Sequence, residues 1–198
     1  SSSNDPSQDG FSEKQIVLFE KTYTKIHQEL GYKTATHILN SNGVLRFAIK
    51  DNTVRLGIAL YGITENPNLK QICSLCSTIS QIRKIEKGAR VGYQNAFVAK
   101  KEMKIAVIPI GYGDGINRKL GEGHGSVLIA NKLCAIIGQV SMDSLMVDIS
   151  NIDAKEGDEV ILFDNQLTLQ KIADDLDTIP YEIMGTLNRR IKRVYLDE

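Results

Sequence analysis

The sequence predicts a chain in two parts, a short α/β part followed by an all-β domain. Over residues 1–66, one long helical pattern precedes alternating strand and helix patterns, an order typical of βαβ units in a parallel sheet or barrel. Over residues 67–198, short apolar runs alternate with polar turns, which indicates a β-rich domain. We therefore expect a domain boundary close to residue 66.

A helix is predicted over residues 11–30. Its apolar residues recur at steps of three and four and so share one face; they are Ile16, Phe19, Tyr23, Ile26 and Leu30. Ser12 and Gln15 have the spacing of a capping box, so we expect the helix to start there. Gly31 is a typical residue to end it.

The rest of the first part is predicted to consist of short elements. Residues 34–39 and 53–60 have the composition of strands, and residues 40–43 that of a turn. Residues 44–49 fit one or two helical turns. This alternation is the reason for expecting an α/β layer or barrel here.

Six strands are predicted in the second part, at residues 72–85, 104–110, 126–130, 133–137, 144–149 and 159–163. Asn131 and Lys132 are expected to form the two-residue loop of a hairpin. Thr168 is expected to cap a helix that runs to Leu176, and residues 189–196 to form a last strand.

The composition is that of an ordinary globular protein and argues against two classes of partner. Of 198 residues, 42% are hydrophobic, and 24 basic residues balance 24 acidic ones, so the formal net charge is zero. We therefore expect a small-molecule partner, and neither nucleic acid nor a membrane. No apolar run reaches the roughly 20 residues of a membrane span, and the first residues do not resemble a signal peptide, so we expect a cytoplasmic protein.

The three cysteines are interpreted as reduced structural thiols. Cys73 and Cys76 form a C-x-x-C pair, but a strand would direct their side chains to opposite faces. Cys134 stands alone, so no second pair completes a tetrahedral zinc site. We therefore expect no metal site.

Three loops carry residues that are suited to binding or catalysis, at residues 37–43 (HILNSNG), 55–62 (RLGIALYG) and 111–115 (GYGDG). The loops after the last two strands of an α/β barrel often bind phosphate through backbone N–H groups, a hydroxyl and a helix start. Ser41 and Gly57 fit that chemistry. Serine and glycine are also common in turns for conformational reasons alone, so both interpretations stay open.

Tyr112 follows an apolar strand, within the GYGDG loop. A phenol with an ordinary pKa of about 10 is a poor base at neutral pH unless a nearby cation stabilises the phenolate. Tyrosines in such places also serve in interfaces or in packing. The loop by itself therefore does not assign a catalytic role.

Five motifs, taken in order, resemble the alanine racemase family; they are NSNG (40–43), VRLGIALYG (54–62), GYGDG (111–115), SMDS (141–144) and IPYE (179–182). The resemblance covers nearly the whole chain. Two positions depart from the usual pattern, since Leu56 stands in place of a proline and Ser141 in place of a cysteine.

The resemblance implies a fold type III pyridoxal phosphate (PLP) enzyme that acts as a homodimer. Residues 1–66 would then be the C-terminal portion of the PLP-binding α/β (TIM-type) barrel, and residues 67–198 the C-terminal β domain. Such an enzyme interconverts L-alanine and D-alanine for peptidoglycan synthesis.

The resemblance also implies which residues bind the phosphate of PLP. Ser41, the backbone of Gly57 and Ile58, and Tyr181 match the phosphate-binding positions of the family. For the first three, this agrees with the phosphate chemistry of the two loops.

Arg55 matches the arginine that donates a hydrogen bond to the pyridine nitrogen of PLP, and His37 the histidine that supports it. A guanidinium stays protonated, so it disfavours protonation of the ring nitrogen and weakens the ring as an electron sink. A carbanion that is less stabilised is reprotonated quickly, which favours racemisation over transamination. Without the motif, an exposed arginine beside a strand would be the preferred interpretation.

Tyr112 matches one of the two bases of the family, and a lysine is the other. Inversion of a stereocentre through a planar intermediate needs an acid and a base on opposite faces. Met142 and Asp143 match the family's M-D pair, in which the methionine backbone helps to bind the substrate carboxylate. In the family, Tyr112 and Met142 would serve the active site of the partner subunit.

The lysine that holds PLP lies, in the family, in a segment resembling VKANAYGHG, which does not occur in this sequence. The histidine of a segment like HFSSSD is also absent. The chain does not begin with Met. We therefore expect a C-terminal fragment that is inactive alone. Two alternatives stay open: another racemase or a decarboxylase of the same barrel type, although GYGDG with SMDS argues against a decarboxylase, or a non-catalytic dimerisation module.

Overall fold

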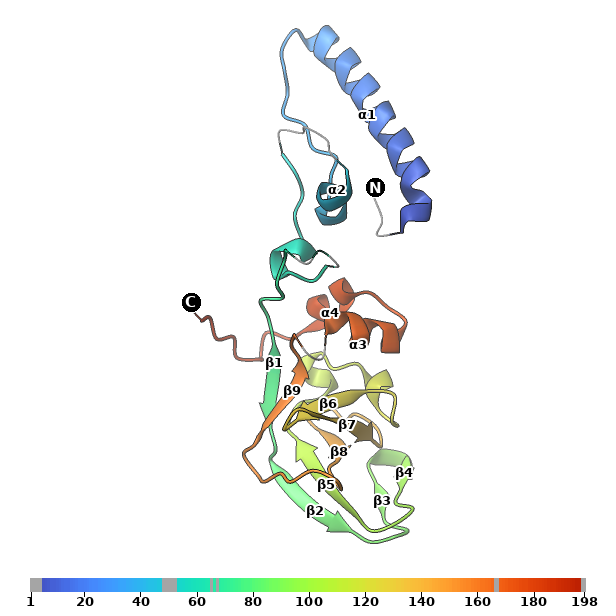
Figure 1. Cartoon of the computed structure of the whole chain (residues 1–198), viewed down its shortest axis with the longest axis vertical. Helices are drawn as coiled ribbons and strands as arrows, with labels where there is room; N and C mark the ends of the chain where they lie inside the picture. Colours follow the sequence, from blue (N-terminus) through green and yellow to red (C-terminus); the bar gives the residue numbers. More distant parts are fainter. Residues whose placement is uncertain (1–4, 48–52, 65, 67, 166–167, 197–198) are drawn as a thin grey trace. The chain divides into compact units, whose positions relative to one another are not determined.

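A computed structural model describes residues 5–47, 53–64, 66, 68–165 and 168–196 of the chain (Figure 1). The chain divides into two compact units, Ser1–Ile72 and Cys73–Glu198. The first contains helices and short extended segments, and the second is dominated by an antiparallel sheet. The predicted order of an α/β part and a β-rich domain is confirmed.

The long helix α1 (Asp9–Leu30) starts earlier than predicted. A 3-10 turn, η1 (Pro6–Gln8), leads into it, and the Asp5 side chain caps that turn. Aspartate followed by proline is itself a good helix start, so the chain is already helical before Ser12. The capping box expected at Ser12 and Gln15 is therefore wrong, and Ser12 is buried within α1 instead.

Gly31 ends α1, as predicted. Its φ of 71° lies in the left-handed region that favours glycine, and its N–H donates to the carbonyl of His27. Of the predicted apolar face, the first three residues are half-buried and the last two exposed; they are Ile16, Phe19, Tyr23, Ile26 and Leu30. None of the helices in the described residues is long and apolar enough to cross a membrane.

Two extended segments of the first unit pair in parallel. The N–H groups of Thr53 and Arg55 donate to the carbonyls of Thr36 and Leu39, at 3.3 and 2.9 Å. The parallel direction agrees with the predicted βαβ order. The pairing includes a single isolated bridge, so the full strands predicted from residues 34 and 53 do not form in the described part of this unit.

Helix α2 (Ser41–Arg46) begins within the predicted turn. Asn40 caps it, because its side-chain oxygen accepts a hydrogen bond from the Gly43 N–H at 2.9 Å. The helical turns expected over residues 44–49 thus start and end earlier, and residues 48 and 49 lie outside the described residues.

A 3-10 turn, η2 (Ile58–Tyr61), replaces the end of the second predicted strand. The N–H groups of Gly57 and Ala59 donate to the hydroxyl of Ser41, and so these groups are not available for a strand ladder. The side-chain contact therefore overrides the strand propensity of residues 53–60.

The second unit contains a seven-stranded antiparallel sheet in the order β1-β9-β6-β7-β8-β5-β2 and a two-stranded ladder of β3 and β4. The strands are β1 (Leu75–Thr78), β2 (Gln81–Ile85), β3 (Arg90–Val91), β4 (Phe97–Val98), β5 (Met103–Ile108), β6 (Ser126–Ile129), β7 (Lys132–Ile137), β8 (Leu145–Asp148) and β9 (Glu159–Phe163). Each of the six predicted segments contains strand structure, whereas β3 and β4, with two residues each, are not predicted.

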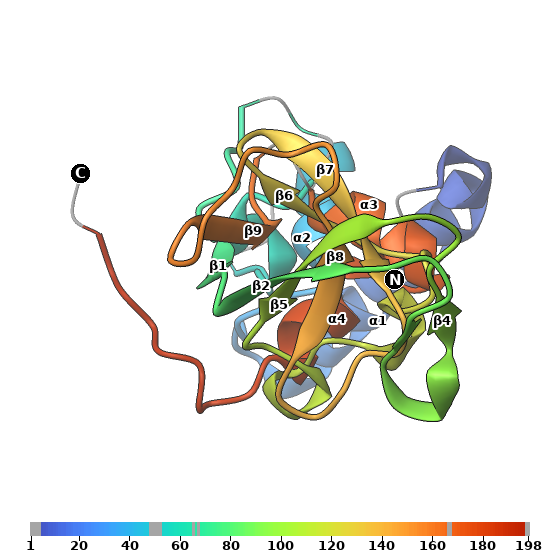
Figure 2. The same ribbon diagram turned by 90° about the horizontal axis from the view of Figure 1, so that it is seen from below.

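The segment predicted as one strand over residues 72–85 is two strands at opposite edges of the sheet. Only Ile79 and Ser80 separate β1 from β2; their N–H groups donate to the carbonyls of Asp158 and Val107. Two residues span only about 7 Å, so the two edges must meet and the sheet must curl. Figure 2 shows the strands curling round the interior of this unit.

The β6–β7 hairpin turns one residue earlier than predicted. Ile129 pairs with Lys132, which makes Ala130 and Asn131 the loop in place of Asn131 and Lys132. The two loop residues have φ values of 48° and 60°, which is the geometry of a type I′ turn.

Two helices follow β9. The first, α3 (Leu169–Leu176), is capped by Thr168, whose side chain accepts from the Lys171 N–H, as predicted. The second, α4 (Pro180–Thr186), is not predicted, although a proline at the first helical position is a usual start. Residues 189–196 form no strand in the structure, so that prediction is wrong.

The core of the second unit lies on the inner face of the sheet. Its fully buried residues include Ile108, Leu145, Val147, Ile149 and Val160, each 0% exposed. They come from β5, β8 and β9 and the turn after β8, so adjacent and distant strands of the curled sheet both contribute to one interior.

Replacement of Ile108 by alanine is expected to lower the free energy of unfolding by about 2–5 kcal/mol, because it leaves a cavity in a packed core. Leu133→Ala is the matched control, since Leu133 is 63% exposed on β7; we expect it to change stability by less than about 0.5 kcal/mol. Urea unfolding followed by circular dichroism measures both. Equal losses would contradict this assignment of the core.

Candidate functional site

In the first unit, the hydroxyl of Ser41 joins two of the loops selected from the sequence. Its oxygen accepts the N–H of Gly57 at 2.8 Å and that of Ala59 at 3.4 Å. Ser41 is 2% exposed, and Ile58, which follows Gly57, is 5% exposed. Three of the predicted phosphate-binding residues, Ser41, Gly57 and Ile58, are therefore together in one small cluster.

This cluster fits a phosphate group. The Ser41 oxygen uses its lone pairs to accept two N–H groups, which leaves the hydroxyl hydrogen to donate to an anion. The hydroxyl stands at the start of α2, where backbone N–H groups favour negative charge.

Arg55 and His37 lie beside this cluster in the chain and are both exposed. The Arg55 Nη2 donates to the carbonyl of Ile38 at 3.2 Å. The Arg55 backbone forms an isolated parallel β-bridge with Asn40, the cap of α2. Because a guanidinium has five N–H groups, this bond leaves most of them to contact a ligand.

In the second unit, the GYGDG loop forms a 3-10 turn, η4 (Tyr112–Asp114), that docks on the SMDS loop. The Tyr112 N–H donates to the Ser141 carbonyl at 2.9 Å, and the Gly113 N–H donates to the Met142 carbonyl at 2.8 Å. The predicted base and the predicted substrate-binding residue are thus held by adjacent backbone hydrogen bonds.

Sheet pairing brings these two loops together. The last residue of β5, Ile108, is paired with the first residue of β8, Leu145, in an antiparallel ladder. The loop that leaves β5 and the loop that enters β8 therefore lie at the same end of two neighbouring strands.

The close approach of the two loops requires glycine. A Cβ atom on Gly111 would lie 2.2 Å from the Ser141 oxygen, and one on Gly113 would lie 3.0 Å from the Met142 oxygen. Gly115 has a φ of 105°, and a Cβ there would lie 2.4 Å from the Thr186 oxygen at the end of α4.

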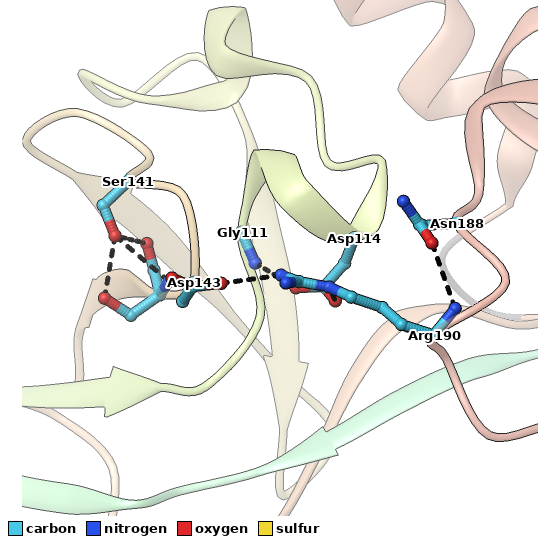
Figure 3. Close-up of polar contacts among 7 residues, drawn as sticks. Gly111, Asp114, Ser141, Asp143, Asn188 and Arg190 are labelled. Carbon is cyan, nitrogen blue, oxygen red and sulfur yellow. Dashed lines mark hydrogen bonds and ion pairs between the residues drawn. The ribbon is translucent and has the colours of Figure 1, made fainter.

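Asp114 is the polar centre of the turn (Figure 3). Its Oδ2 accepts the Gly111 N–H at 2.9 Å, and its Oδ1 accepts the Arg190 Nε at 2.6 Å. Burial by itself would raise the pKa of Asp114, but the hydrogen bond and charge of Arg190 and the Gly111 N–H outweigh it and lower that pKa. The carboxylate therefore stays ionised and holds the turn.

Arg190 also reaches the second loop. Its Nη2 donates to the Asp143 Oδ1 at 2.8 Å, so one guanidinium contacts both loops (Figure 3). The Asn188 N–H donates to the Asp114 carbonyl at 2.9 Å, which fixes the chain just before Arg190 against the turn.

The Tyr112 side chain is 46% exposed and has a cation beside it. The guanidinium carbon of Arg118, on η5 (Arg118–Leu120), lies 5.9 Å from the centre of the phenol ring. Arg118 Nη2 in turn donates to the Gln139 side chain at 3.4 Å. A guanidinium over a ring stabilises its orientation by about 0.5–1 kcal/mol at an exposed site.

The remaining predicted residues are accessible. Met142 is 52% exposed, and the Asp143 side chain is 67% exposed apart from its contact with Arg190. Tyr181, on α4, is 42% exposed, and burial of part of its phenol raises its pKa. Tyr181 thus belongs to the second unit, whereas the other predicted phosphate-binding residues belong to the first.

Sequence reasoning missed three residues of the site: Asp114, Arg118 and Arg190. Asp114 was within the GYGDG motif, but its role as an acceptor depends on the conformation of the turn. Arg190 was within a segment that was predicted as a strand, and a contact across 76 positions has no local pattern.

The cysteines carry no site in the described structure. None of Cys73, Cys76 and Cys134 forms a disulfide in the part of the chain that the structure describes. Cys73 precedes β1, so the expectation that it shares one strand with Cys76 is wrong. Burial raises the pKa of each thiol, that of Cys134 to about 11. No group of three His, Cys, Asp or Glu residues among the described ones could hold a metal ion.

Two family models match this chain. The model of the alanine racemase N-terminal domain matches residues 1–65, and that of the C-terminal domain matches residues 72–195. The alanine racemase of Vesicomyosocius okutanii is 45% identical over 182 residues, which are 89% of this chain and 50% of that protein. The alanine racemase of Helicobacter pylori (strain Shi470) is 40% identical over 177 residues, 81% of this chain and 47% of that protein. The chain thus spans about half the length of the curated relatives it matches.

Solved structures agree with these matches. The alanine racemase of Clostridium difficile 630 in complex with cycloserine has a TM-score of 0.89 and 33% identity, over 99% of this chain and 54% of that chain. The alanine racemase of Bartonella henselae with covalently bound pyridoxal phosphate has a TM-score of 0.77 and 33% identity, over 89% of this chain and 52% of that chain. The resemblance inferred from the five motifs is confirmed: the chain belongs to the alanine racemase family.

Proposed function

We propose that the protein to which this chain belongs is a PLP-dependent enzyme that interconverts L-alanine and D-alanine for peptidoglycan synthesis. The main support is that the two domain models of the alanine racemase family both match the chain. Each match covers one of the two compact units, and each unit contains one of the candidate clusters. The cluster around Ser41 fits a phosphate, and the turn of Tyr112 presents an accessible phenol. We also propose that the protein is cytoplasmic and acts as a homodimer, as implied by the family resemblance.

The residues of the first unit would hold the cofactor. Ser41 and the backbone of Gly57 and Ile58 would bind the phosphate. Tyr181 keeps the phosphate-binding role that the family resemblance implies. Arg55 would donate to the pyridine nitrogen, with His37 in support. When bound, PLP supplies the electron sink that makes the α-hydrogen of an amino acid acidic. A structure of the Bartonella henselae relative contains covalently bound pyridoxal phosphate, which is consistent with this assignment.

The residues of the second unit would handle the substrate. Tyr112 would remove or return the α-proton on one face of the substrate, and a lysine outside these 198 residues would act on the other. The Met142 carbonyl already accepts the Gly113 N–H, so the Met142 N–H is the group left to bind a carboxylate, beside Asp143. A Bacillus anthracis relative has been solved with bound L-Ala-P, which supports alanine as the substrate class.

Tyr112→Phe is expected to lower kcat of the full-length protein by about 10²–10⁴-fold in both directions, since it removes a proton-transfer group but keeps the ring. Tyr93→Phe is the matched control, because Tyr93 is 70% exposed in the same unit. Polarimetry with L-alanine, D-alanine and a panel of other amino acids measures the rates. Full activity of Tyr112→Phe would rule out Tyr112 as a proton-transfer group. A higher rate with another amino acid would assign that amino acid, not alanine, as the substrate.

Ser41→Ala is expected to weaken PLP binding by about 10- to 150-fold, because a hydrogen bond to a charged group contributes roughly 1.5–3 kcal/mol. Ser74→Ala, at an exposed position before β1, is the control. The full-length protein is dialysed against buffers with decreasing PLP concentrations, and the absorbance of the cofactor that stays bound gives the affinity. Equal retention by both variants would remove Ser41 from the phosphate site.

The 198-residue chain by itself is expected to lack a specific PLP–lysine linkage, because no segment like VKANAYGHG occurs in it. Incubation with PLP, borohydride reduction and peptide mass spectrometry test this. We expect only scattered, substoichiometric labelling of surface lysines. One lysine labelled stoichiometrically would contradict the expectation that the chain is inactive alone.

A further inference from the structure

Arg190 connects the C-terminal segment to both loops of the candidate site. Its Nε donates to Asp114 Oδ1 at 2.6 Å, and its Nη2 donates to Asp143 Oδ1 at 2.8 Å. Asp114 ends the turn that carries Tyr112, and Asp143 follows Met142. A single side chain thus spans the loop of the proposed base and the loop of the proposed substrate-binding residue.

The Arg190–Asp114 contact differs from an ordinary surface ion pair, which contributes little to stability. The Asp114 side chain is only 13% exposed, and its second oxygen already accepts the Gly111 N–H. A Cβ on Gly113 would lie 2.7 Å from the Arg190 Nη2, so the guanidinium packs directly against the turn. Two ion pairs share one planar group, which fixes its orientation.

We propose that Arg190 is a positioning residue for racemisation. It fixes the Asp114 turn against the Asp143 loop and so fixes the position of the Tyr112 phenol relative to the Met142 backbone. This inference rests on the proposed function for its kinetic consequence. Arg190 itself contacts neither the phenol nor a substrate in this scheme.

The kinetic test uses three variants of the full-length protein. Arg190→Gln is expected to lower kcat about tenfold or more, since a small misplacement of a reacting group has a large effect on rate. Arg190→Lys keeps one charge but cannot form the planar pair of contacts, so it should recover part of the rate. Arg189→Gln removes the adjacent exposed arginine and is the matched control, with kcat expected within twofold of wild type.

Two further variants separate the loops. Asp114→Asn removes an acceptor from the Tyr112 turn and should act mainly on kcat. Asp143→Asn weakens the contact beside Met142 and should act mainly on KM for alanine. A structural role alone would lower the amount of active enzyme in both variants and leave KM unchanged.

A second readout does not depend on activity. In the 198-residue chain labelled with 3-fluorotyrosine, the Tyr112 resonance is identified by its loss in Tyr112→Phe. We expect Arg190→Gln to shift or broaden that ¹⁹F resonance, and Arg189→Gln to leave it unchanged. Unchanged spectra and kcat in folded Arg190→Gln would overturn the proposal. If Arg190→Gln changes the Tyr112 resonance but the full-length protein racemises no amino acid, only the proposed function is rejected.

The pH dependence of stability gives a third comparison. Because the pKa of Asp114 is lowered in the folded chain, its contribution to stability is present above the ordinary aspartate value of about 4 and is lost as the pH falls through the lowered pKa. The stability difference between wild type and Arg190→Gln in urea unfolding should therefore be larger at pH 7 than at pH 3. A difference independent of pH would contradict the coupling of Arg190 to Asp114.

Discussion

The candidate site of the β-rich unit depends on a backbone contact that only glycine permits. The turn from Gly111 to Gly113 lies directly on the carbonyls of Ser141 and Met142, and a Cβ on Gly111 would lie only 2.2 Å from the Ser141 oxygen. The contact follows from the antiparallel pairing of β5 and β8, which ends beside both loops. Sheet register therefore places the phenol of Tyr112, and the glycines allow the loops to meet.

The two clusters hold their loops by different physical means. Around Ser41, a buried neutral hydroxyl accepts two backbone N–H groups and keeps its own hydrogen to donate to an anion. Around Asp114, one guanidinium bridges two carboxylates, so the cluster keeps a net negative charge and serves to fix the loops, not to bind an anion. The first arrangement suits phosphate binding, and the second suits the fixed placement of a neighbouring side chain.

Local patterns in the sequence predicted α1, α3 and the six strand-containing segments, because periodicity and caps act over a few residues. Contacts over longer separations decided the rest. The segment 72–85 has the pattern of one apolar strand, but it divides after β1. Its first half pairs with β9 and its second half with β5. The strand pattern around Ile58 gives way to a 3-10 turn because Ser41, 16 positions before Gly57, takes the backbone N–H groups. The motifs identified the candidate loops, but not the long-range partner Arg190.

The departure from the family at Ser141 is explained by the structure of its loop. The Ser141 Oγ contacts the Ser144 carbonyl at 2.7 Å and accepts the Ser144 N–H at 3.1 Å, while the Ser141 N–H donates to the same carbonyl. The four-residue turn is thus closed on itself, with Met142 and Asp143 at its tip. A cysteine thiol is a weaker donor than a hydroxyl, so serine at this position holds the tip at least as firmly. The substitution is therefore compatible with the placement of Met142 that the proposed function requires.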